Sequence, residues 1–167
     1  GASGDMLIGS LLDAGLSIDT LRDELQLLAV SNYQITSETR QQHALTGTHF
    51  SVNVDLDEQP HRHLSDIEKI LRASRLPETD IESSLAIFRR LARAEARVHG
   101  STIEQVHFHE VGAVDSIVDV VGFVVGLRLL GIDQVYASPL TLGSGFIQSA
   151  HGRLPVPVPA TMEILSE

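Results

Sequence analysis

Apolar and polar positions in residues 5–57 predict two helices followed by two strands. Apolar residues recur at helical spacing over 5–14, where Gly15 ends the run, and again over 18–28 after the N-cap candidate Ser17. Residues 33–42 are more polar, whereas residues 48–57 alternate between apolar and polar side chains, as in a half-buried strand. We therefore predict helices at 5–14 and 18–28 and a β-hairpin made by the two extended segments.

The rest of the chain predicts further helices joined by short extended segments. Residues 65–68 and 79–82 have the spacing of capping boxes, which predicts helices ending near Ser74 and at His99. The apolar run 114–130 predicts a helix that Gly131 ends, and residues 160–165 begin another. We expect a short strand or loop at 106–108, a strand at 134–138, and extended backbone through the proline-rich residues 154–159.

This element order predicts a mixed α/β (α+β) fold, with helices packed on a small mixed sheet. A chain of 167 residues with 43% hydrophobic residues is long enough to bury one core. We therefore expect residues 1–167 to form a single domain.

Charge and cysteine content narrow the possible functions. Twelve basic and 22 acidic residues give a net charge of −10, which argues against a nucleic-acid scaffold. An acidic surface of this kind attracts cations, including divalent metal ions. The absence of cysteine excludes disulfides, iron–sulfur ligation, thiolate zinc sites and a cysteine nucleophile. The longest apolar stretch, 117–132, contains two charged residues and is too short to span a bilayer, and no targeting segment is visible. We expect a cytoplasmic protein that binds neither nucleic acid nor membrane.

The densest group of candidate functional residues lies between residues 107 and 119. His107 and His109 would share one face of a strand, and Asp115 and Asp119 would share one face of a helix. A strand–turn–helix could therefore aim two imidazoles, Glu110 and two carboxylates at one point, which suits zinc, nickel, manganese or iron. The alternative is a structural role, with one histidine bonded in the core and Asp115 as an N-cap.

Two further groups are candidates for ligand binding. His61 and His63 precede a helix start that carries Asp66, so this region could hold a metal, a phosphate or a carboxylate, or it could be a solvated loop. The residues Ser3, Gly4 and Asp5 come directly before a helix, where small residues let backbone N–H groups approach a ligand. They lack the Lys-Ser/Thr end of a P-loop, and an ordinary turn is the alternative.

These segments, taken together and in this order, resemble the LarC-type nickel insertion protein family, which makes the nickel-pincer nucleotide cofactor of lactate racemase. The resemblance covers almost the whole chain. The matching stretches are GASGDMLIGSLLDAGL (1–16), HRHLSDI (61–67), VHFHEVGAVDSIVDVVG (106–122) and SPLTLGSGFIQSAHGRLPVPVPATMEIL (138–165).

The resemblance implies a metal chelatase of the lyase class, a nickel cyclometallase. The family inserts nickel into pyridinium bis-thiocarboxylic acid mononucleotide, forming one carbon–nickel and two sulfur–nickel bonds, and it consumes CTP with manganese or magnesium. The family's CTP site belongs to its C-terminal region. We therefore expect this chain to be the N-terminal domain, without the family's first strand and CTP region, and inactive in isolation. Its expected partners are the mononucleotide, the C-terminal half of the same protein and, in a homo-oligomer, further copies.

The resemblance also suggests roles for the candidate residues. His107, His109 and Glu110 would be nickel ligands or the base that removes the proton from the metallated carbon. Further metal ligands would be Asp115 and Asp119, and, as a second group, His61, His63 and Asp66. Ser3, Gly4 and Asp5 would hold the mononucleotide phosphate or a metal. Two alternatives remain: a nickel- or nucleotide-binding module without activity, and an unrelated metal-dependent hydrolase.

Overall fold

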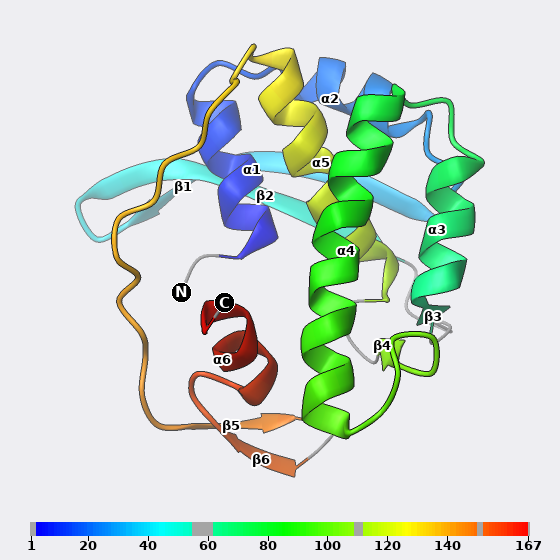
Figure 1. Cartoon of the computed structure of the whole chain (residues 1–167). Coiled ribbons are helices and arrows are strands. Elements are labelled where there is room, and N and C mark those ends of the chain that lie inside the picture. Colours follow the sequence, from blue (N-terminus) through cyan, green and yellow to red (C-terminus); the bar gives the residue numbers. More distant parts are fainter. Residues whose placement is uncertain (1–2, 55–61, 109–111, 150–151, 167) are drawn as a thin grey trace.

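A computed structural model of the chain describes residues 3–54, 62–108, 112–149 and 152–166 (Figure 1). It confirms the mixed α/β class, but its strands form three separate antiparallel pairs instead of one mixed sheet. The elements are α1 (Gly4–Asp13), α2 (Ile18–Leu25), β1 (Tyr33–Gln42), β2 (Leu45–Val54), β3 (Arg62–His63), α3 (Leu64–Arg72), α4 (Glu78–His99), β4 (His107–Phe108), α5 (Val114–Leu129), β5 (Phe146–Ser149), β6 (Gly152–Pro155) and α6 (Pro159–Leu165).

The first two strands form the predicted hairpin. Their antiparallel register runs from Tyr33 opposite Val54 to Gln42 opposite Leu45, so β2 begins three residues before the predicted 48–57 segment. Phe50 of β2 is buried in the core, as its place in the alternating pattern predicts. Helix α1 crosses this strand at Gly9, where an added Cβ would lie only 2.6 Å from the carbonyl oxygen of Thr48. The backbone of α1 therefore lies directly against the hairpin (Figure 1).

Helix α5 forms the centre of the core. Its buried residues contact α1, α2 and α4, and Figure 1 shows it between these helices. Two glycines let α1 approach closely, because an added Cβ would lie 3.0 Å from Ile8 Cδ1 at Gly122 and 2.7 Å from Leu11 Cδ1 at Gly126. The fully buried core side chains of α5 are Ile117, Val118, Val121 and Val125. Among the described residues no helix combines the length and the apolar character needed to cross a membrane.

The two predicted capping boxes do not form at the predicted residues. At the start of α3 a capping box forms two residues earlier, where Asp66 accepts from the backbone N–H of the N-cap residue His63. Helix α3 begins at Leu64 after the N-cap residue His63, and Glu68 binds Arg89 of α4 at 2.6 Å. Helix α4 begins one residue before Thr79, and Glu82 forms ion pairs with Arg72 and Arg89. The Glu68–Arg89 and Glu82–Arg72 ion pairs join α3 to α4, whereas the Glu82–Arg89 pair lies within α4.

The short strand or loop expected at 106–108 contains the strand His107–Phe108. Three other elements differ from prediction. Helix α2 ends at Leu25 and not at residue 28. The predicted strand 134–138 is absent: these residues are exposed and have no strand partner in the described parts of the chain. The β5–β6 hairpin is an element that the sequence did not predict, and it forms around residues 146–155.

Candidate functional site

The start of α1 lies against the first turns of α5. An added Cβ on Gly4 would lie 2.6 Å from Asp119 Cβ and 2.7 Å from Asp119 Oδ2, so only glycine fits here. Next along the chain, the backbone N–H of Asp5 donates a hydrogen bond to the Asp119 carboxylate. The structure thus brings together two candidate groups that the sequence placed more than a hundred residues apart. We call this contact the α1–α5 junction: Ser3, Gly4, Asp5, Asp115 and Asp119.

The close contact at Gly4 leads to a prediction about stability. We expect Gly4→Ala to lower the free energy of unfolding by about 1–3 kcal/mol, because the methyl group overlaps Asp119 and the two helices must separate. Chemical denaturation measures this change. Gly47→Ala is the matched control, since the nearest atom to its added Cβ is 3.8 Å away. Equal stabilities of the two variants would contradict the described contact.

Asp119 is a partly buried carboxylate, and only one of its two oxygens has a hydrogen-bond partner among the described residues. Its Oδ1 is buried and has no hydrogen-bond partner among the described residues. The pKa of Asp119 is raised from 3.8 to about 6, mainly by burial and also by the negative charges of Asp5 and Asp115, against the opposing effect of the hydrogen bond from Asp5. An oxygen placed this way favours a proton or a cation as its missing partner.

The other two carboxylates lie in the first turns of their helices. Asp5 accepts a hydrogen bond from the Ser3 hydroxyl, and Asp115 Oδ1 accepts one from the backbone N–H of Ser116 at 2.7 Å. Asp115 is exposed and Asp5 is half-buried. Both lie at helix N-termini, whose positive dipole ends stabilise negative charge. The junction therefore brings three carboxylates into one region, although the three do not converge on a common metal position. Carboxylate oxygens suit a hard or borderline divalent cation.

The two histidine-containing segments are neighbouring strands. In the β3–β4 pair, Arg62 lies opposite Phe108 and His63 opposite His107. The His63 ring donates from Nδ1 to the carbonyl oxygen of Val106 at 2.9 Å, which fixes the tautomer of the neutral ring. Metal-binding histidines commonly make this kind of second hydrogen bond to a carbonyl group.

Arg62 is a residue of this region that the sequence reasoning did not select. Its guanidinium donates to the carbonyl oxygen of Gly112 at 2.7 Å and so ties β3 to the residues just before α5. Its position between His61 and His63, in a stretch that matches the family pattern, was the available signal.

Several predicted site residues have no described side-chain position. His61, His109 and Glu110 lie outside the described residues, and the side chain of His107 is likewise not described. Asp66 is described: it accepts from the His63 backbone N–H at 3.1 Å, and this bond is the main cause of its lowered pKa. Within the described ranges, no three histidine or acidic side chains converge on a metal position.

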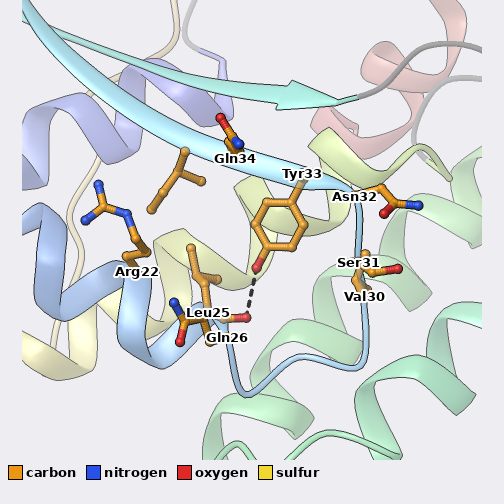
Figure 2. A pocket seen from close by; sticks show the side chains of 9 residues that line it. Arg22, Leu25, Gln26, Val30, Ser31, Asn32, Tyr33 and Gln34 are labelled. Atoms are coloured by element: carbon orange, nitrogen blue, oxygen red, sulfur yellow. Dashed lines mark hydrogen bonds between the residues drawn. The ribbon is translucent and has the colours of Figure 1, made fainter.

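A separate cavity of about 490 Å³ lies between the end of α2 and the start of β1 (Figure 2). Tyr33 points into it and donates from its hydroxyl to the carbonyl oxygen of Leu25 at 2.8 Å. Arg22, on the cavity wall, forms an ion pair with Asp19. None of the predicted site residues lines this cavity, so we do not include it in the candidate site.

Comparisons with known proteins point to one family. The sequence model of a family described as "Nickel insertion protein" matches residues 1–167. A relative from Desulfitobacterium hafniense, named pyridinium-3,5-bisthiocarboxylic acid mononucleotide nickel insertion protein, is 51% identical over 99% of this chain and 41% of its own length. A relative from Citrifermentans bemidjiense, provisionally named a nickel insertion protein, is 52% identical over 99% of this chain and 43% of its own length. The chain thus spans less than half of these relatives, and no solved structure matches it significantly.

Proposed function

Because this chain belongs to the nickel insertion protein family, we propose that it is the N-terminal, nickel-handling domain of a nickel insertase. The proposed substrates are Ni²⁺ and pyridinium-3,5-bisthiocarboxylic acid mononucleotide, the compound that the name of the Desulfitobacterium relative contains. We further propose that the intact protein works in the cytoplasm. There it would use CTP with manganese or magnesium through a part of the polypeptide outside residues 1–167.

The observation that carries this proposal is the unpartnered Oδ1 of Asp119 at the α1–α5 junction. A nickel ion there would supply the missing partner of this oxygen and offset the repulsion among three carboxylates. Carboxylates hold nickel less tightly than thiolates do, so a site of this kind can release its ion. That property suits an ion that is the cargo of the reaction and must pass to the sulfur atoms of the substrate.

The junction also favours one of the two roles considered for residues 3–5. The backbone N–H of Asp5 is already bonded to Asp119, and three carboxylates repel a phosphate group. We therefore propose that Ser3, Gly4 and Asp5 help to hold the metal, and that the phosphate of the mononucleotide binds elsewhere. Asp115 and Asp119 are the proposed metal ligands, and His63, with His61 and Asp66, forms the second proposed group.

The proposed chemistry exchanges a proton for nickel at the pyridinium carbon. The C–H bond breaks, its electron pair forms the carbon–nickel bond, and a base on the protein accepts the proton, so no oxidant or reductant is needed. A base with a pKa near neutral suits this proton transfer, and an imidazole has such a pKa. His107, His109 and Glu110 are the proposed bases or ligands, since they lie in the chain between the start of β4 and the start of α5.

Alanine substitution of the β4 histidines tests this function. In the full-length protein we expect His107→Ala/His109→Ala to lower the rate of nickel insertion at least about 100-fold, as loss of a general base or ligand does. Formation of the nickel-containing mononucleotide, followed by mass spectrometry, measures the rate. His49→Ala is the control, because His49 lies on the β1–β2 hairpin and bonds Ser51. Unchanged insertion by the double variant would reject the proposed role of these histidines.

A further inference from the structure

The segment from Gln134 to Leu142 is extended and exposed. It follows α5 and runs along the outside of the molecule to β5 (Figure 1). Its large apolar side chains are open to solvent, with Val135 65% and Tyr136 86% exposed, and the others are Leu140 and Leu142. Within the described part of the chain, residues 133–144 make no hydrogen bond between backbone groups.

The sequence of this segment is that of a paired strand and not of a free loop. Residues 134–138, Gln-Val-Tyr-Ala-Ser, include two residue types that are enriched in strands. No charged residue occurs anywhere from Gln134 to Ser149, although one residue in five of the chain is charged. Exposed strand edges normally carry charged residues that block pairing with other chains, whereas depletion of charge marks the core of an interface. A free segment of this composition would be an aggregation site.

We propose that residues 134–138 form a β-strand paired with a segment of the intact protein that lies outside residues 1–167. Pro139 has no backbone N–H, so it limits the pairing to the residues before it. Leu140 and Leu142 then extend the contact through their side chains. This inference rests on the proposal that the chain is one part of a longer protein, and it is independent of the nickel chemistry.

The length of the relatives favours a partner strand from the same polypeptide. This chain matches only 41–43% of those proteins, so more than half of such a polypeptide lies outside the region described here. A covalently attached segment meets the strand at an effective concentration in the millimolar range, whereas a second copy meets it at its much lower solution concentration. The attached segment therefore has the advantage over a second copy.

A photo-cross-linking experiment on the full-length protein tests this assignment. The photoreactive residue p-benzoylphenylalanine replaces Tyr136, whose exposure lets the probe fit without disturbing the core. We expect a cross-linked product of monomer mass, in which the peptide carrying the probe joins a peptide outside residues 1–167. The same probe at Gln41, an exposed position of β1, is the control and is expected to give no such product.

Hydrogen exchange of the full-length protein provides the second measurement. We expect alternate backbone amides of residues 135–138 to exchange at least about 100-fold more slowly than in an unpaired segment, because a strand paired on one side bonds every second N–H. The proposal requires both results. It is overturned by free exchange at these amides, by cross-links only between copies or only within residues 1–167, or by the absence of any cross-link at Tyr136. Loss of nickel insertion in other variants would leave both readouts unchanged.

Discussion

Replacing Asp119 with asparagine is expected to stabilise the fold and to abolish nickel insertion. In the native protein Asp119 has a pKa of about 6 instead of 3.8, mainly because it is buried. This shift corresponds to roughly 3 kcal/mol of destabilisation when the carboxylate is ionised. The group is only half-buried and solvent screens it, so we expect a gain of about 1–2 kcal/mol for Asp119→Asn at pH 7. The amide keeps an oxygen that can accept the hydrogen bond from Asp5.

The raised pKa of Asp119 determines at which pH the substitution stabilises the fold. Because the pKa of Asp119 is raised in the folded state, the folded protein binds more protons than the unfolded chain between pH 3.8 and about 6. The contribution of Asp119 to stability is therefore present below pH 3.8 and is lost as the pH rises through 6. The advantage of Asp119→Asn should accordingly appear over this range and vanish below it. Urea denaturation at pH 3 and pH 7 measures both values.

The exposed residue Asp23 supplies the control. We expect Asp23→Asn to change the free energy of unfolding by no more than about 0.5 kcal/mol at either pH, as is usual for surface substitutions. A destabilised Asp119→Asn variant at pH 7 would show that the carboxylate has a structural partner, which would contradict the geometry described here.

The second large effect is expected at Arg128, which joins three helices. Its Nε donates to Asp80 Oδ2 of α4 at 2.7 Å, and its Nη2 donates to Glu24 of α2. The Asp80 side chain is only 4% exposed. Arg128→Met would leave this carboxylate buried without its cation, which typically costs 3–5 kcal/mol. Because Arg128 is itself one-third exposed and water can enter, we expect a loss of about 2–4 kcal/mol in unfolding free energy.

Two variants show whether the ion pair causes this loss. Arg22→Met removes an arginine from an exposed ion pair with Asp19, so we expect a change of at most about 0.5–1 kcal/mol. The double variant Arg128→Met/Asp80→Asn should recover part of the stability, because the remaining side chain is uncharged. If the double variant were no more stable than Arg128→Met, the loss would come from packing of the arginine stem instead.

The hydrophobic pattern predicted helices and strands correctly where their apolar side chains face the core. The apolar face of β2 and the apolar run of α5 gave correct elements because their side chains form the core. The capping boxes were misplaced, because α3 begins after His63, whose N–H binds Asp66, and α4 begins after Pro77. Glu68 and Glu82 have arginine partners on neighbouring helices, which local sequence cannot show. The strand predicted at 134–138 has the right composition, but a strand also needs a partner, and none lies in the described chain.

The candidate site could be predicted only in pieces. Helical spacing placed Asp115 and Asp119 on one face of α5, and the small residues at 3–5 marked the start of α1 as a place of close approach. Their meeting depends on tertiary packing, since Gly4 contacts Asp119 only after α1 packs against α5. The pairing of His63 with His107 depends in the same way on the antiparallel β3–β4 register.

A calorimetric titration with Ni²⁺ tests most directly whether the α1–α5 junction holds the metal. The titration compares the native chain with Asp119→Asn and the control Asp23→Asn at pH 7. The expected stability gain of Asp119→Asn means that lost binding would not reflect unfolding. We expect the native chain and the control to bind nickel alike, and Asp119→Asn to bind at least about tenfold more weakly, a difference of about 1.4 kcal/mol. Equal nickel affinity in all three proteins would contradict the assignment of the metal to this junction.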